Sequence, residues 1–386
     1  MTSILKIELS PKRIFGLDLL RAFAILFVIL AHGSYLLPEG LAGINGFFVF
    51  DGVSIFFVLS GFLIGGIFIT LIEKNELNKT MLLNFWKRRW FRTLPTYFLV
   101  LTILVILHVI STGNFNFLRI GSYYIFSQNL VQVHPDFFPE AWSLSVEEWF
   151  YLTMPLLIAM LIWFFKITPK KSVLLVALII IPAVALFRYY RFMHTPVIGI
   201  YEYDSVFRRQ VITRLDALMF GVLGAYIHFY HFTKWIRYKN ILFVTGIVLF
   251  LVSKFYFTNI SGLFSAVFSF TFISIATLLL LPFLNGLKSG KGFLYKGITY
   301  ISLISYSMYL LNLSVIKMWI IDSIPWTSIF SNNHLLIIIR YGLYWCLVIV
   351  LSILLYKYFE IPMTKLREKR IIKMVALEEV PVLVVG

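Results

Sequence analysis

The stretch Gly16–His32, GLDLLRAFAILFVILAH, decides how the rest of the chain is interpreted. Its apolar residues predict a membrane-spanning helix, yet it carries Asp18, Arg21 and His32, each of which is costly to bury in lipid. At 3.6 residues per turn, Arg21 and His32 share roughly one helix face and stand about 16 Å apart along the axis. Because an intramembrane charge is by default a functional-site hypothesis, we predict a site with a cation at one depth and a proton carrier at another.

The composition is that of a polytopic membrane protein. Of the 386 residues, 60% are hydrophobic, 18% aromatic and only 13% charged, against about a quarter charged in an ordinary soluble domain. The net charge of +16 would suggest nucleic acid in a soluble protein, but here the basic residues cluster in short loops between apolar runs. We therefore expect the lipid bilayer and no nucleic acid as a partner, and we predict no metal site. The one cysteine, Cys346, excludes an intrachain disulfide.

Ten apolar runs are each long enough to cross a bilayer, which takes about twenty residues. They are residues 14–37, 46–72, 91–111, 143–165, 172–188, 205–230, 240–257, 262–284, 298–321 and 335–358. The predicted fold class is all-α, a polytopic integral membrane protein with about ten transmembrane helices. Lys and Arg gather in both terminal segments and in the connections after alternate runs, so both termini are predicted to be cytoplasmic. We expect one transmembrane domain over residues 1–370 and a short cytoplasmic tail over 371–386.

One predicted outer connection is rich in arginine, where the charge rule predicts little. It holds Arg188, Arg191, Arg208, Arg209 and Arg214, with Glu202 and Asp204 beside them. Two explanations stay open, which are recognition of an anionic acceptor and ion pairs with lipid headgroups. The predicted substrate-binding residues on this side are Arg214, Asp216, Asn129 and Trp142.

The segment Phe85–Pro95, FWKRRWFRTLP, lies at the predicted cytoplasmic mouth of the third helix. Its guanidiniums suit phosphate oxygens and its flat rings suit stacking, as a phosphorylated nucleotide carrier such as coenzyme A would require. Anchoring of a cytoplasmic loop by basic residues and an aromatic belt explains the same pattern. The predicted cofactor-binding residues are Arg88, Arg89, Arg92, Trp90 and Tyr97.

The segment Glu140–Leu157, EAWSLSVEEWFYLTMPLL, places Glu147 and Glu148 at the predicted outer end of the fourth helix. Adjacent carboxylates cannot share one helix face, so at most one of them points inward toward His32. There it would fix the tautomer and raise the basicity of the imidazole, as a general base requires. Acidic residues in a first helical turn also favour the helix dipole, which is the structural alternative.

Together these motifs resemble membrane acyltransferase family 3, whose members modify bacterial surface carbohydrates. The matching motifs are LDLLRAFAILFVILAH (17–32), GVSIFFVLSGFLI (52–64), the RxxR of Arg89 and Arg92, WSLSVEEWFY (142–151), RLDALMFGVLGAY (214–226), SYSMYLLN (305–312) and YKYFEIPM (356–363). Against the family pattern, Asn312 stands where a histidine is frequent and Trp149 where a glutamine is common. An SGNH-type domain often follows the last span in this family, whereas this sequence stops shortly after its last predicted span, so we expect a stand-alone form.

The resemblance implies an acyl-CoA donor bound from the cytoplasm, a glycan or lipid-linked sugar acceptor, and essential roles for Arg21, His32, Arg89 and Arg92. We therefore predict a multi-pass O-acyltransferase of the bacterial cytoplasmic membrane, in the first place an O-acetyltransferase that uses acetyl-CoA. The predicted catalytic residues are His32, Arg21, Glu147, Glu148 and Asp18.

Several alternatives stay open at this point. His32 acts either as a general base or as a transient acyl carrier. The alternative function is an ion-coupled transporter of an anionic or sugar substrate, in which the buried charges form the coupling path. A third interpretation is a membrane sensor or scaffold without chemistry.

Overall fold

The computed structural model describes residues 13–113, 116–195, 197, 199–256, 261–329 and 333–366, and within these ranges it contains helices and no strand. Eight helical segments of this part of the chain are long and apolar enough to cross a membrane. Their main helices are α1 (Phe15–Gly33), α3 (Gly52–Lys74), α4 (Lys79–Thr112), α6 (Ala141–Phe165), α7 (Pro169–His194), α12 (Ser269–Leu284), α13 (Gly292–Leu311) and α15 (Asn333–Leu355). The predicted all-α, polytopic membrane architecture is confirmed.

Two of the ten predicted spans match helices that are not among these eight segments. The run 205–230 contains α9 (Leu215–Tyr230), which is apolar but has only 16 residues, and the run 240–257 matches α11 (Lys239–Tyr256). The predicted tail 371–386 lies outside the described residues, as do residues 1–12. The cytoplasmic position of both termini therefore stays a prediction.

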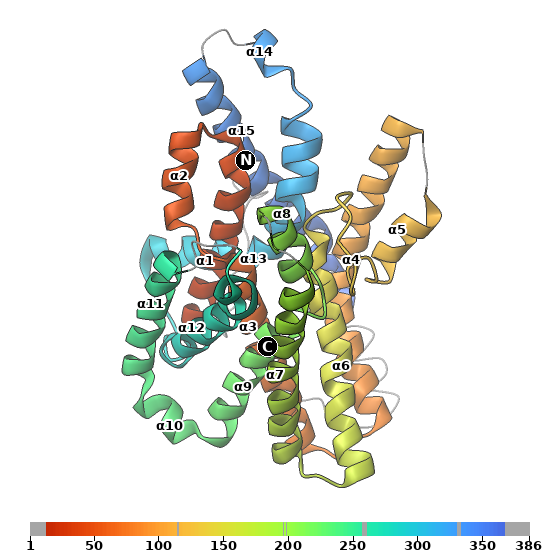
Figure 1. The fold of residues 1–386 in the computed structure, drawn as a ribbon, viewed down its shortest axis with the longest axis vertical. Coiled ribbons are helices and arrows are strands. Elements are labelled where there is room, and N and C mark those ends of the chain that lie inside the picture. Colours follow the sequence, from red (N-terminus) through yellow and green to blue (C-terminus); the bar gives the residue numbers. More distant parts are fainter. Residues whose placement is uncertain are drawn as a thin grey trace.

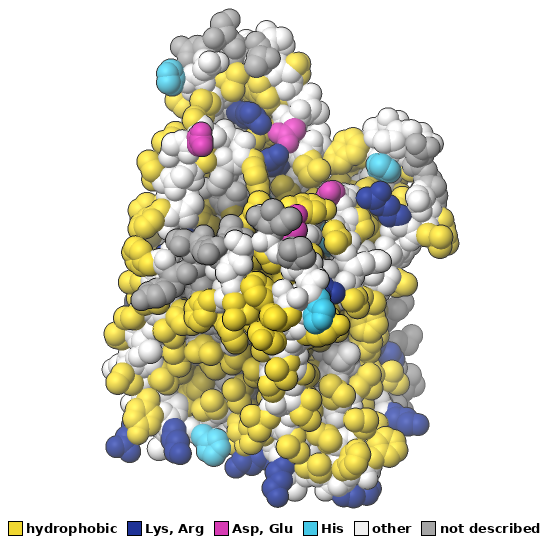
Figure 2. Space-filling view, in the orientation of Figure 1, with side chains coloured by type: hydrophobic (Ala, Val, Ile, Leu, Met, Phe, Trp, Pro, Cys, Tyr) yellow, Lys and Arg dark blue, Asp and Glu magenta, His cyan; other side chains and the backbone are white. Residues whose placement is uncertain are grey.

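The long helices form one bundle, with α1, α3 and α13 near its centre and α4 and α5 (Phe117–Tyr124) at one side (Figure 1). Lys and Arg side chains gather at the lower end of this view (Figure 2). The turn between α6 and α7 and the short α10 (Phe232–Arg237) lie at that same end (Figure 1). This arrangement agrees with the alternation of basic connections along the sequence.

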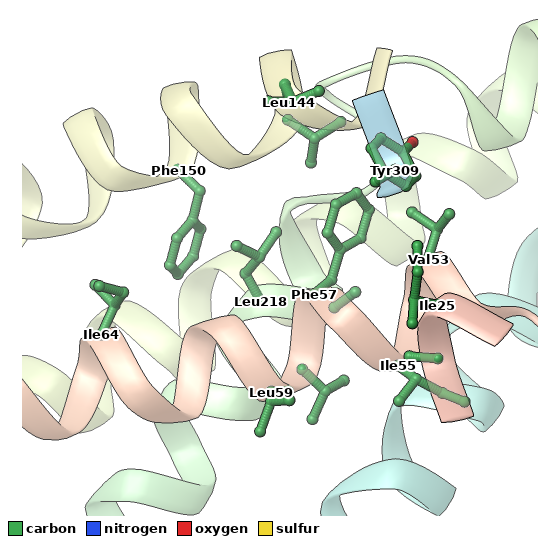
Figure 3. Close-up of a cluster of buried hydrophobic side chains, with 14 of the residues drawn as sticks. Ile25, Val53, Ile55, Phe57, Leu59, Ile64, Leu144, Phe150, Leu218 and Tyr309 are labelled. Atoms are coloured by element: carbon green, nitrogen blue, oxygen red, sulfur yellow. The ribbon is translucent and has the colours of Figure 1, made fainter. Parts of the chain in front are cut away.

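The core is built on close contact between α3 and α9. A Cβ atom on Gly61 would lie 1.9 Å from the Leu218 carbonyl oxygen, and one on Gly221 would lie 2.1 Å from the Val58 carbonyl oxygen. Only glycine permits this approach, and close packing of small residues is what holds helices together in lipid. Phe57 and Leu218 lie in the buried cluster that this contact forms (Figure 3).

Short π-helical segments interrupt the regular helices at three places that matter for the site. They are Tyr203–Arg208, Asn312–Ile321, which directly follows α13, and Tyr356–Glu360, which directly follows α15. A π-turn changes the direction in which the following side chains point and is frequent at functional sites. Each of these segments begins or ends with a polar residue that reappears in the site below, namely Arg208, Asn312 and Glu360.

Candidate active site

Two neighbouring cavities lie among the central helices. The first, here called the arginine chamber, is lined by Arg21, Arg89, Arg92, Glu147 and Glu360, among others. The second, the histidine chamber, is smaller and is lined by His32, Asp51, Glu140, Trp142, Arg208 and Arg209, among others. Arg21 and His32, predicted to share one helix face, thus open into different cavities.

Val53 and Tyr309 line both chambers and therefore form part of the wall between them. The Tyr309 hydroxyl lies 2.7 Å from Ser143 Oγ and donates to the Glu140 carbonyl oxygen at 3.0 Å. Tyr309, Val53 and Phe57 lie close together at this point (Figure 3). The two chambers therefore adjoin at Val53 and Tyr309.

In the arginine chamber, Arg89 is held in place whereas Arg92 is open. Arg89 Nη2 donates to Glu147 Oε2 at 3.0 Å and to the Tyr151 hydroxyl at 2.6 Å. Arg92 is exposed to the cavity, and the described residues offer it no hydrogen-bond acceptor. Arg21 also keeps free donors, because its nearest carboxylate, Asp18, is 4.0 Å away.

The helix that carries the RxxR motif begins earlier than the predicted apolar run 91–111. Because α4 begins at Lys79, Arg89 lies about 15 Å along the axis from the start of the helix, where it meets Glu147 of α6. The basic residues ahead of the apolar run are therefore helical, and their position at the cytoplasmic mouth stays a prediction.

Only part of the predicted cofactor-binding set lines the arginine chamber. Arg89 and Arg92 do, whereas Arg88 is exposed outside it. Trp90 stacks against Trp86 with 6.3 Å between ring centroids. Tyr97 is fully buried and donates to the Tyr123 carbonyl oxygen at 3.0 Å, which makes it a packing residue.

Asp18 is predicted from the sequence to be catalytic, but its contacts are those of a residue that holds the fold together. Its carboxylate accepts from Arg13 Nε at 2.8 Å and from Ser302 Oγ at 2.7 Å, and it lines neither chamber. These contacts tie the start of α1 to α13. The pairing of Asp18 with Arg21, expected from their spacing, is correspondingly loose.

The prediction that Glu147 or Glu148 contacts His32 is wrong. Glu147 pairs with Arg89, and Glu148 accepts from Thr93 Oγ1 at 3.2 Å outside both cavities. His32 Nδ1 instead lies 2.5 Å from Asn312 Oδ1. Adjacent glutamates do point to different surroundings, as predicted, but neither reaches the imidazole.

Most of the predicted substrate-binding set is structural. Arg214 and Asp216 are fully buried, and Asp216 accepts two hydrogen bonds from Arg188, at 2.7 and 3.1 Å. Asn129 donates to the carbonyl oxygens of Trp142 and Arg209 at 3.0 and 2.6 Å, which ties its loop to the start of α6 and to the residue after the segment Tyr203–Arg208. Only Trp142 lines the histidine chamber.

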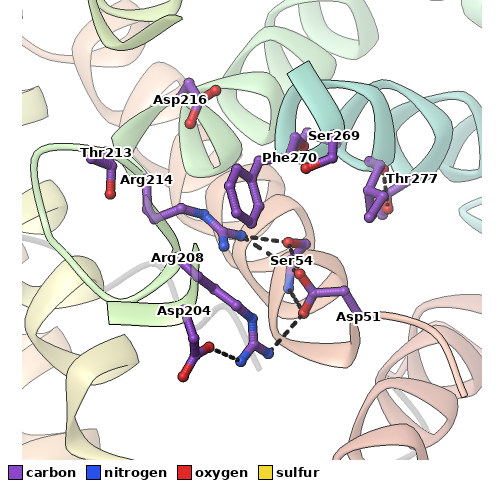
Figure 4. A network of polar contacts seen from close by, with 12 residues as sticks. Asp51, Ser54, Asp204, Arg208, Thr213, Arg214, Asp216, Ser269, Phe270 and Thr277 are labelled. Carbon is purple, nitrogen blue, oxygen red and sulfur yellow. Dashed lines mark hydrogen bonds and ion pairs between the residues drawn. The ribbon is translucent and has the colours of Figure 1, made fainter. Parts of the chain in front are cut away.

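The charged wall of the histidine chamber is a network centred on Arg208 (Figure 4). Arg208 pairs with Asp204 at 3.0 Å and with Asp51 at 3.5 Å, and Asp51 also caps the first turn of α3 through Ser54. Burial alone would lower the pKa of Arg208, but the two carboxylates hold it above its ordinary value. The outer arginines are thus paired within the protein, and Arg208 and Arg209 face the chamber.

Four site residues lie outside the predicted site set, and for three of them a signal existed. Glu360 lines the arginine chamber and accepts from Ser307 Oγ at 3.0 Å; it lies two residues after the last predicted apolar run, inside the YKYFEIPM motif. Asp51 is a carboxylate inside the predicted run 46–72, and the structure makes it the cap of α3. Asn312 stands where a histidine is frequent in the family, whereas Tyr309 carries no such signal.

Glu140 lines the histidine chamber, and its burial predicts that the stability of the protein depends on pH. It accepts from Ser314 N at 3.0 Å and Ser314 Oγ at 2.6 Å, and burial raises its pKa from 4.5 to about 7. The folded protein therefore keeps a proton that the unfolded chain loses, so this group contributes stability below pH 4.5 that is lost as pH rises to about 7. The loss is on the order of 3 kcal/mol.

We expect Glu140→Gln to remove this loss, because a neutral amide can still accept from Ser314. The measurement is the thermal midpoint of the detergent-solubilised protein across pH 4.5 to 7.5, compared with the wild type. Identical pH profiles for the two proteins would show that Glu140 does not titrate in this range.

The chain is similar to known acyltransferases over most of its length. A family model described as "Acyltransferase domain" matches residues 14–357. The chain is 35% identical over 175 residues to "O-acetyltransferase OatA" of Staphylococcus aureus, and 31% identical over 180 residues to "Peptidoglycan O-acetyltransferase OatA" of Listeria monocytogenes. These alignments cover 41% and 43% of the chain but only 26% and 27% of the relatives, so the chain spans about a quarter of their length. No solved structure matches the chain.

Proposed function

Because the chain belongs to this acyltransferase family, we propose that it is a membrane O-acetyltransferase that moves an acetyl group from cytoplasmic acetyl-CoA to a hydroxyl of a cell-envelope glycan. The observation that carries the proposal is the pair of adjoining chambers, one with open guanidiniums and one with an imidazole. They separate donor binding from acceptor chemistry inside one helix bundle.

The charge of the arginine chamber supports an anionic donor. Three guanidiniums, those of Arg21, Arg89 and Arg92, line it together with only two carboxylates, those of Glu147 and Glu360. An uncompensated cation at membrane depth is costly, and phosphate oxygens bind arginine through strong charge-assisted hydrogen bonds. We assign the phosphates of coenzyme A to Arg92 and Arg21, with Arg89 held by Glu147 as the fixed wall behind them.

The acyl group then reaches the histidine chamber past Tyr309. In the general-base route, His32 takes the proton of the acceptor hydroxyl as its oxygen attacks the thioester carbonyl. The tetrahedral intermediate breaks the carbon–sulfur bond, and the thiolate takes the proton from the imidazolium. In the carrier route, the unprotonated imidazole nitrogen of His32 attacks the thioester carbonyl and the carbon–sulfur bond breaks to release the thiolate. The acceptor oxygen then attacks the acyl-imidazolium, the carbon–nitrogen bond breaks, and the hydroxyl proton passes by way of the imidazole to the thiolate.

The acceptor side of the proposal rests on the relatives and on the chamber wall. The relatives carry names that specify O-acetylation, in one case of peptidoglycan, and we propose a cell-wall glycan or its lipid-linked precursor. Trp142 offers an aromatic face, and Asp51 and Arg208 offer polar groups to sugar hydroxyls. We place the protein in the bacterial cytoplasmic membrane, with its basic end in the cytoplasm.

The proposal is tested with membrane vesicles, labelled acetyl-CoA and isolated glycan. For Arg92→Ala we expect the KM for acetyl-CoA to rise about 10- to 100-fold, since a charge-assisted hydrogen bond contributes about 1.5 to 3 kcal/mol. Arg88→Ala, one turn away and exposed outside the chamber, is the matched control and should keep the wild-type KM.

Two results would contradict the proposal. An unchanged KM in Arg92→Ala would remove the phosphate site from the arginine chamber. Substrate flux across the vesicle membrane without label in the glycan would favour the ion-coupled transporter instead.

A further inference from the structure

We infer that Asn312 is a positioning residue that selects Nε2 of His32 as its reactive nitrogen. This inference rests on the proposed function, because it concerns the imidazole of the same site. Asn312 is fully buried, and its Oδ1 lies 2.5 Å from His32 Nδ1. The two residues are 280 positions apart, so only the packing of α1 against the end of α13 brings them together.

The orientation of the Asn312 amide is decided by its other contacts. Nδ2 donates to the carbonyl oxygens of Met308 at 2.9 Å and Tyr309 at 2.8 Å. Both partners are backbone carbonyls, which can only accept. Turning the amide would place Oδ1 against two other oxygens, so the oxygen must face His32.

An oxygen at Nδ1 decides the tautomer of the imidazole. Asn312 Oδ1 has no proton to give, so Nδ1 must be the N–H donor in this contact. A neutral imidazole carries one N–H, and its lone pair is then on Nε2. The described residues give Nε2 no hydrogen-bond partner, and the His32 side chain is partly exposed in the histidine chamber, where an acceptor hydroxyl would bind.

A neutral amide at this position accepts the Nδ1–H without placing a negative charge beside the ring. The charged groups that line the same chamber are Asp51, Glu140, Arg208 and Arg209, and Lys317 lies on the π-helical segment that Asn312 begins. Three of these five are basic, so the surroundings do not favour a cationic ring. Asn312 therefore presents the unprotonated Nε2 that both the base route and the carrier route need.

Two substitutions separate positioning from packing. Asn312→Leu has a similar size but removes the acceptor, so both tautomers become available. We expect its kcat to fall about 100-fold, within the range by which general-base catalysis contributes, while the KM for acetyl-CoA stays within about twofold.

Asn312→Asp keeps an oxygen at Nδ1 and adds a negative charge, which stabilises the protonated ring. We expect it to retain turnover, with the acid limb of its pH–rate profile moved up by about one to two units.

The measurements are pH–rate profiles and the split between kcat and KM, together with the nitrogen NMR spectrum of histidine-labelled protein. The wild type should show Nδ1 protonated and Nε2 unprotonated in His32, assigned by loss of the signal in His32→Gln. Wild-type kcat in Asn312→Leu, an unshifted acid limb in Asn312→Asp, or a protonated Nε2 in the wild type would each overturn the inference. Failure of the wild type to acetylate glycan would instead reject the proposed function, and the NMR result would still decide the tautomer.

Discussion

Replacing His32 with alanine is expected to lower glycan acetylation about 10³-fold, the largest effect on activity that we predict. The reason is that, in the part of the chain that the structure describes, no other imidazole lines either chamber, and a positioned base contributes about 10² to 10⁴ in rate. His32→Gln should be as inactive, although its side-chain amide can still donate to Asn312. Loss of activity in both variants would therefore reflect the missing base and not a disturbed fold.

The measurement is label transferred from acetyl-CoA to glycan, at matched protein level in the membrane. His194→Ala is the control, since His194 is exposed at the end of α7 and, among the described residues, makes its hydrogen bond and its ring contact with Tyr190 of its own helix. Wild-type acetylation in His32→Ala would reject the assignment of the histidine chamber as the place of reaction.

Replacing Arg188 with methionine is expected to destabilise the protein by about 3 to 5 kcal/mol, the largest effect on stability. Arg188 and Asp216 are both fully buried, and Arg188 also donates to the Thr213 carbonyl oxygen and to Thr271 Oγ1, each at 2.7 Å. Removal of the guanidinium leaves the Asp216 carboxylate buried without its charge partner, in the part of the bundle where α7, α9 and α12 meet.

A second substitution tests this reason. Arg188→Met combined with Asp216→Leu removes both charges and should recover most of the lost stability, because the unpaired charge causes the cost. Arg340→Met, which breaks the half-exposed pair with Asp322 at 3.2 Å, should change stability by less than about 1 kcal/mol. Thermal midpoints in detergent measure the stability of all three variants. An Arg188→Met protein as stable as the wild type would contradict the prediction.

Local patterns were sufficient where one helix decides the outcome. The apolar runs predicted the membrane helices, and the spacing of Arg21 and His32 correctly placed two polar groups at different depths along α1. Local patterns did not suffice at Arg89, because the basic stretch before the apolar run 91–111 already belongs to α4, which begins at Lys79. They did not suffice at Asp216 either, because a buried ion pair and a binding site have the same residue types.

The sequence by itself therefore determined the architecture and the polar faces of individual helices, because hydrophobicity and helical periodicity are local properties of the chain. Only the tertiary structure decided the partners: Asn312 and not a glutamate for His32, Arg188 for Asp216, and Tyr309 for the wall between the chambers. Hydrogen bonds and ion pairs act over a few ångströms. Which groups come within that distance depends on how helices far apart in the chain cross, and close crossings such as that of α3 and α9 at Gly61 and Gly221 set it.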